Sequence, residues 1–426
     1  MDEKWFQRLS NIHDGVPVRF KISDFNNTRE AFFNNNESGP DFVYQNIRDK
    51  KAHIKLDSLK KLKSDIENCP TTASVVKELY FKKINEKISL INLIIKAELL
   101  MNSDITDSEE HVNDFRNISD EIFGKIKPDT FFHTCSVLNE RLSSVPSHVQ
   151  KTLGYIRLKN MFDSLPAGRV PSICISPMIP DEGSLLTSRS EIKKRFIIAL
   201  EENGLDNWRV VSGHSTRSNF VVKTHSRRII LPNETALNSR RAESVMTERN
   251  VDALIEHELT HILRYENGLR SPLKLLAIGL NSYIKGEEGV ATYREQIVKG
   301  ATDYSNGKSY FAAGVAMGLD RGGKPRTFRE GFEIMHDFYK VYFSNENLNA
   351  SNIAFGVCAH LFKGTNGKIP GLFLSLQCSY RDGNIGIHSL LHDKPRWAEY
   401  LLIGKFDPTN DFHTTALSEL GIIPKL

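Results

Sequence analysis

Two histidines four positions apart, with a glutamate directly after the first, constrain this chain more than any other feature. The segment reads His257-Glu258-Leu259-Thr260-His261. It lies within residues 244–265, whose apolar residues recur at the three- and four-residue spacing of an α-helix. One turn of such a helix places both imidazoles on the same face, where two nitrogens can converge on one tetrahedral ion. The segment therefore predicts a helix that carries a metal site.

Glu258 projects about 100° around that helix from His257. From there its carboxylate can take a proton from a water molecule that a metal ion activates, which is the role of a general base in zinc hydrolases. A purely structural metal site has no use for such a base, so Glu258 favours a catalytic site. The alternative is a helix that merely exposes His and Glu to solvent.

A catalytic zinc site keeps three protein ligands and leaves a fourth position open. The five cysteines lie far apart, are odd in number and form no Cys-x-x-Cys pair, so we expect reduced thiols and a carboxylate as third ligand. Glu287 and Glu288, at the start of a helix predicted over 289–298, are the candidates. The residues alone do not decide between them, and both also favour a helix N-terminus. If Glu288 is the ligand, Glu287 becomes a partner that orients the ligands.

The chain changes character near residue 166. Residues 1–166 are mainly helical in pattern, with apolar periodicity over 76–101 and 131–142, and the asparagine-rich stretch 25–38 is expected to be a loop. After residue 166, β-branched runs predict a small antiparallel or mixed sheet from strands at 209–211, 220–223 and 228–231. The sequence therefore predicts an α+β fold with a helical N-terminal region, 1–166, and a second domain, 167–426.

Further elements are predicted around the histidines. Asn267-Gly268 is expected to end the histidine-bearing helix. Helices are expected at 191–202 and 327–343, and short strands around 372–377.

Net charge and hydropathy indicate which classes of partner the sequence does not require. The formal net charge of +4, from 56 basic and 52 acidic side chains, is too small to require nucleic acid or a membrane surface. The start of the chain lacks the basic and apolar regions of a secretory signal. The apolar run 88–101 is interrupted by Lys96 and Glu98, which favours a buried helix over a membrane span. We expect a cytoplasmic protein with no nucleic-acid partner and no membrane span.

The residues after the second histidine extend the pattern with Arg264, Asn267-Gly268, Pro272-Leu273, Gly279-Leu280 and Glu287-Glu-Gly-Val-Ala291. This resembles the tyrosine carboxypeptidase family, which includes the microtubule-associated tyrosine carboxypeptidase and bacterial proteins with a Gln-Glu-Gly-Leu-Ala motif. The resemblance is specific over 257–295 and weaker from about residue 40 to the C-terminus. Later segments at 328–330, 361–364 and 380–383 follow in matching order.

The resemblance implies a zincin-like metallopeptidase core of the gluzincin type that holds one Zn²⁺ per chain. His257, His261 and Glu288 would be the ligands and Glu258 the base. The family's activity implies removal of a C-terminal aromatic, tyrosine-like residue from a peptide or protein tail, and a tubulin-like tail is one such partner. The chain departs from the family at Leu259-Thr260, two residues where the family has three, and this spacing suits a regular helix.

An exopeptidase also needs groups that hold substrate. A cation would bind the free α-carboxylate, and Lys363 and Arg381 are the candidates from the later matching segments. Tyr380 and His388 are candidates for a donor to the developing oxyanion. Each of the four has an alternative as a solvated or packing residue. Arg264 either orients a carboxylate near the ligands or stabilises the C-terminal end of its helix.

Two other functions fit the same residues. A zinc endopeptidase would share the metal and Glu258 but would cut internal bonds. A catalytically inactive module that binds peptide tails would use the metal only to anchor a carboxylate. The sequence leaves the substrate, the oligomeric state and the choice among these functions open.

Overall fold

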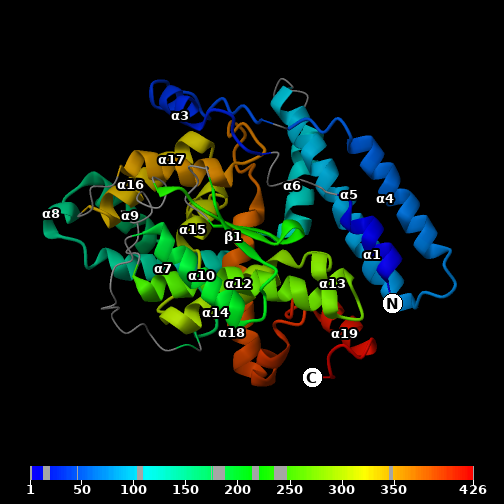
Figure 1. Cartoon of the computed structure of the whole chain (residues 1–426). Coiled ribbons are helices and arrows are strands. Elements are labelled where there is room, and N and C mark those ends of the chain that lie inside the picture. Colours follow the sequence, from blue (N-terminus) through cyan, green and yellow to red (C-terminus); the bar gives the residue numbers. More distant parts are fainter. Residues whose placement is uncertain are drawn as a thin grey trace. The chain divides into compact units, whose positions relative to one another are not determined.

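The computed structural model describes residues 2–12, 20–45, 47–102, 109–173, 175, 188–213, 220–234, 247–344 and 349–425 (Figure 1). The α-helices are α1 (Glu3–Ser10), α3 (Phe25–Phe33), α4 (Ala52–Glu67), α5 (Ser74–Asn102), α6 (Glu109–Phe123), α7 (Pro128–Leu142), α8 (Ser147–Gln150), α9 (Leu153–Asp163), α10 (Arg189–Glu202), α12 (Glu248–Arg270), α13 (Leu275–Ile278), α14 (Ile284–Lys299), α15 (Gly307–Ala316), α16 (Phe328–Tyr342), α17 (Ala350–Leu361), α18 (Cys378–Asp393) and α19 (Asp411–Glu419). The strands are β1 (Arg209–Ser212), β2 (Val221–Lys223) and β3 (Arg228–Leu231), and the 3₁₀ helices are η2 (Thr224–Ser226), η3 (Leu319–Arg321), η4 (Ser375–Gln377) and η5 (Pro395–Tyr400).

The fold is α+β, with many helices and one small sheet, as the sequence predicts. None of the helices in these described ranges is both long enough and apolar enough to cross a membrane. The helices predicted over 76–101, 131–142, 191–202, 289–298 and 327–343 are confirmed as α5, α7, α10, α14 and α16, with ends that differ by a few residues.

Contacts divide the chain into two compact units. Unit 1 consists of Met1–Asp2, Pro171–Ser305 and Gly383–Leu426, and unit 2 consists of Glu3–Val170 and Asn306–Asp382. The sequence assigned residues 167–426 to one domain, whereas residues 306–382 group with the N-terminal helices. Within unit 2, α15 packs against α7 and α16 packs against α9, and Phe311 of α15 contacts Phe131 and Phe162. This apolar packing between distant segments explains the grouping.

The sheet of unit 1 is mixed, in the order β1-β3-β2. β1 pairs with β3 in parallel and β2 pairs with β3 antiparallel. The three predicted strands are confirmed at nearly the predicted residues. One buried core joins the sheet to α10 and α12, and its members include Phe196, Val210, Ile229, Val251, Ile255, Leu259 and Ile262. The apolar stripe of α12 therefore packs on this core, which leaves another face of the helix for the histidines.

The prediction that Asn267-Gly268 ends α12 is wrong. The helix begins after Thr247, whose side chain accepts a hydrogen bond from Asn250 N, and it runs through Gly268 to Arg270. A Cβ atom on Gly268 would lie 2.4 Å from the backbone N of Ala277 in α13. The glycine thus permits close packing of α13 and does not stop the helix. The helix ends at Ser271, whose backbone is extended before Pro272, as proline requires of the residue before it.

The loop predicted over 25–38 is also wrong in part, because residues 25–33 form α3. Asp24 caps this helix by accepting a hydrogen bond from Asn27 N. Phe32 is 1% exposed and packs edge-on against Phe328 and Phe332 of α16. Capping and aromatic burial together outweigh the low helix propensity of the asparagines.

The strands predicted around 372–377 are absent from the structure, where 375–377 form η4. The N–H of Ser375 donates to Ser119 Oγ at 3.0 Å, and Ser375 Oγ donates to Ser119 O at 3.0 Å. Because the backbone N–H of Ser375 already donates to a side chain, it does not donate to a neighbouring strand.

The close approach at Gly268 predicts a stability difference between two helical glycines. Gly268→Ala should destabilise the chain by at least about 1–3 kcal/mol, since the new methyl group meets rigid backbone. Gly331→Ala in α16 is the matched control, because a Cβ there has no heavy atom within 4 Å and alanine favours a helix by about 1 kcal/mol. Urea unfolding of both variants measures this difference. Equal stability of the two variants would contradict the packing argument.

Candidate metal centre

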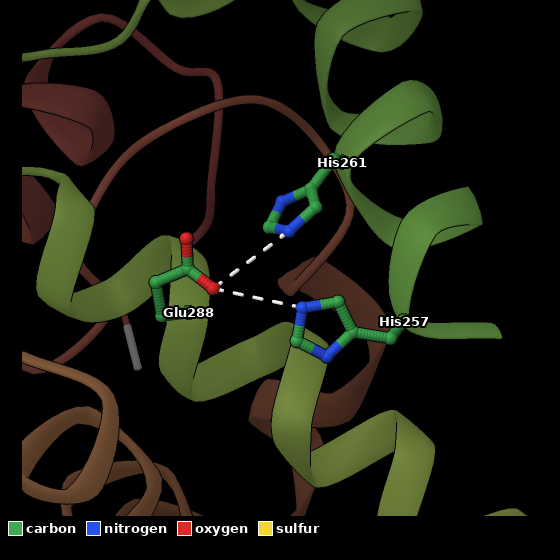
Figure 2. A group of neighbouring side chains, drawn as sticks. All are labelled: His257, His261 and Glu288. Carbon is green, nitrogen blue, oxygen red and sulfur yellow. Dashed lines mark ion pairs between the residues drawn. The ribbon is translucent and has the colours of Figure 1, made fainter. Parts of the chain in front are cut away.

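Helices α12 and α14 lie side by side in unit 1 (Figure 1). His257 and His261 project from α12 and Glu288 projects from α14, so that the three side chains converge (Figure 2). Glu288 Oε2 lies 3.6 Å from His257 Nε2 and 3.8 Å from His261 Nε2. The three side chains are only 14–16% exposed.

This arrangement fits a zinc ion. Tetrahedral coordination at 2.0–2.2 Å separates neighbouring ligand atoms by roughly 3.3–3.6 Å, close to the distances between these atoms. Glu288 Oε2 is buried and accepts no hydrogen bond within the described part of the chain. A buried carboxylate oxygen without a donor is unfavourable, and a cation between it and the imidazoles would remove that penalty. Two histidines and a glutamate are also a ligand set of catalytic zinc sites.

Glu287 contacts the far side of His261. Glu287 Oε1 lies 2.9 Å from His261 Nδ1. When Nδ1–H donates to this carboxylate, the lone pair of Nε2 points toward Glu288, and the ring orientation is fixed. Of the two adjacent glutamates, Glu288 therefore faces both Nε2 atoms and Glu287 supports a histidine from behind.

Glu295 does the same for His257, with Glu295 Oε2 at 3.1 Å from His257 Nδ1. The sequence analysis missed this residue. Its signal was available, because Glu295 follows Glu288 by seven residues, about two helical turns, and so shares a face of α14 with it. Both histidines are thus held by a carboxylate from the same helix.

The carboxylates around the histidines favour positive charge in the metal-free site, and this changes the pKa values of His257 and Glu295. Burial lowers the pKa of His257, but the nearby carboxylates of Glu288, Glu295 and Glu258 outweigh it and raise this pKa to about 10. Burial raises the pKa of Glu295, while His257 and Lys299 lower it to a net value of about 2. Without metal the site therefore holds a proton on His257, and an ion that binds displaces that proton.

A buried ion network surrounds Glu287. Arg264 is fully buried, and its Nη1 lies 3.1 Å from Glu287 Oε2. Lys405 Nζ lies 2.9 Å from Glu287 Oε1. Burial raises the pKa of Glu287, but Lys405, Arg264 and His261 together bring it well below its usual range. Of the two roles predicted for Arg264, its contacts fit the orientation of a carboxylate.

An adjacent face of α14 packs closely on α18. A Cβ atom on Gly289 would lie 2.5 Å from the backbone of Gly383, so both glycines permit this approach. Beyond them, Asn384 Nδ2 and His388 Nε2 lie 2.8 and 2.9 Å from Gln296 Oε1. These contacts with α18 hold α14 in place and so help to position its three glutamates.

The predicted base lies in the expected place on the helix. Glu258 follows His257 in α12, is half-buried, and its charge helps to raise the pKa of His257. Its role as a base remains a prediction.

The four candidates for substrate binding differ in burial and in the unit to which they belong. His388 is fully buried between Tyr293 and Tyr304, and burial lowers its pKa to about 4, so the ring is neutral at pH 7. These contacts fit the alternative that His388 is a packing residue. The other three candidates, Lys363, Tyr380 and Arg381, belong to unit 2.

Within unit 2, each of the two predicted cations lies close to a histidine. Arg381 is fully buried, with Nη2 at 3.4 Å from His133 Nδ1. Lys363 Nζ lies 2.7 Å from His360 Nδ1, and Tyr380 is half-buried in α18. The substrate roles of these three residues stay predictions.

No family model, curated protein or solved structure matches this chain. The link to tyrosine carboxypeptidases therefore depends on the resemblance over residues 257–295.

The contact between Glu295 and His257 predicts an effect on metal affinity. Glu295→Gln should weaken zinc binding by about 10–100-fold, because a neutral amide is a poorer acceptor for the Nδ1–H of His257. Competition with a chromophoric chelator measures this affinity. Glu202→Gln, at an exposed position at the end of α10, is the control and should bind zinc like the wild type. An unchanged affinity in Glu295→Gln would show that the contact does not support the ligand.

Proposed function

We propose that this chain is a zinc-dependent metallocarboxypeptidase that removes a C-terminal, tyrosine-like aromatic residue from a peptide or protein tail. The convergence of Glu288 Oε2 with the Nε2 atoms of His257 and His261 carries the proposal. Three ligands of this kind would leave a fourth coordination position for water or substrate. The resemblance to tyrosine carboxypeptidases supplies the preference for a chain end and for an aromatic residue.

The chain's own residues have distinct tasks in this reaction. A bound zinc ion supplies Lewis acidity toward water and the scissile carbonyl. Glu258 accepts the proton of the attacking water and passes it to the leaving amine. Glu287 and Glu295 hold the two imidazoles so that each presents Nε2.

Loss of a ligand should abolish metal binding. The wild type is expected to hold about one zinc ion per chain, and His257→Ala and Glu288→Ala should each reduce this to background, since two ligands do not make a stable site. Elemental analysis after desalting measures the ratio. His148→Ala in α8, an exposed histidine, is the control and should keep its zinc. Full zinc content in either ligand variant would contradict the assignment.

Loss of the base should abolish turnover. Glu258→Gln should lower peptide hydrolysis by at least about 100-fold while zinc stays bound, because the amide cannot accept the proton. The assay incubates zinc-loaded protein with a peptide library that carries free or amidated C-termini, and mass spectrometry identifies the products. Glu109→Gln, at an exposed position in α6, is the control.

The products distinguish the alternatives. Single residues lost only from free C-termini support a carboxypeptidase and identify the preferred residue. Internal cuts that ignore amidation would instead show an endopeptidase. Zinc binding and tail binding without any product dependent on Glu258 would show a binding module.

A further inference from the structure

Lys405 lies in the segment between η5 and α19 and is 9% exposed. Its Nζ lies 2.9 Å from Glu287 Oε1. The same oxygen lies 2.9 Å from His261 Nδ1. One carboxylate oxygen therefore joins a lysine that is distant in sequence to a candidate zinc ligand.

The backbone of Lys405 is fixed on both sides. Lys405 N donates to Leu276 O at 2.7 Å, and Leu280 N donates to Lys405 O at 3.0 Å. The flanking carbonyls of Gly404 and Phe406 accept hydrogen bonds from the Arg264 side chain. The side chain of Lys405 thus extends from a segment whose backbone is held in place, and its ammonium group pairs with Glu287.

The two carboxylates behind the histidines differ in how their cations are held. Lys299, which pairs with Glu295, has a side chain 33% exposed, so water can partly replace its charge. The side chains of Lys405 and Glu287 are only 11% and 5% exposed. In this more buried setting water can replace less of the charge of Lys405, and Arg264 pairs with the other oxygen of Glu287, Oε2.

We propose that Lys405 is a positioning residue of the metal centre, which holds Glu287 Oε1 where it accepts the Nδ1–H of His261. The inference depends on the zinc site of the proposed function. Lys405 touches neither ion nor substrate in this role and acts only through Glu287 and His261.

Metal affinity of Lys405 variants tests this role. Lys405→Met, which keeps the aliphatic stem, should weaken zinc binding by about 10–100-fold, and Lys405→Arg should recover most of the loss. The absorption bands of the cobalt-substituted protein should shift in Lys405→Met, because the ring of His261 loses its fixed orientation. Lys83→Met is the matched control, since Lys83 forms a similarly buried pair with Glu86 in unit 2. It should keep wild-type zinc affinity.

A double-mutant cycle separates positioning from general stability. If Lys405 acts through Glu287, Lys405→Met should add no further loss of zinc affinity in a Glu287→Gln background. Equal, additive losses in both backgrounds would overturn the proposal, even where Lys405→Met lowers the melting temperature of the metal-free protein. Wild-type zinc affinity and cobalt spectrum in Lys405→Met would also overturn it, while the zinc site would stand. Failure of the wild type to bind zinc would overturn both.

Discussion

The buried contact between α12 and α14 is the constraint on which the site depends. One helix presents two imidazoles, and the other presents the carboxylates of Glu287, Glu288 and Glu295. Buried carboxylates are unfavourable unless cations or hydrogen-bond donors compensate them. Glu287 and Glu295 have such partners, whereas Glu288 Oε2 has no hydrogen bond from the described residues and lies 3.6 and 3.8 Å from the Nε2 atoms of His257 and His261. Under the proposed function, a zinc ion between Glu288 and the two Nε2 atoms would compensate this oxygen.

The parts of this site that the sequence predicted are those encoded by local spacing. His257 and His261 share a helix face because they are four residues apart, and that inference needs no tertiary information. Glu288 could be preferred over Glu287 only by resemblance, since orientation around α14 depends on the helices packed against it. Lys405 could not be found, because its contact with Glu287 joins distant segments and lysines carry no local signal of burial.

The same difference between local signals and distant contacts explains which elements of the fold were predictable from the sequence. Long periodic segments such as α5 and the β-branched runs of the sheet were predictable because their own residues favour one structure. The errors occur where distant contacts decide. Packing of Phe32 on α16 stabilises α3 as a helix. Ser119 Oγ accepts the backbone N–H of Ser375, and Gly268 allows the backbone of α13 to approach α12. Each requires knowledge of a partner far away in the sequence.

The sheet and the metal centre use different faces of α12. Its apolar stripe packs on α10 and the sheet, and this core contains none of the metal ligands. The helix is therefore anchored whether or not an ion is present, and the ligands need little rearrangement to bind one. Under the proposed function, zinc would bind a largely preformed site and would add stability that rises with the logarithm of its concentration, unlike small zinc domains that fold only with metal. In the proposed enzyme, such preorganisation would keep His257, His261 and Glu288 in place during the reaction.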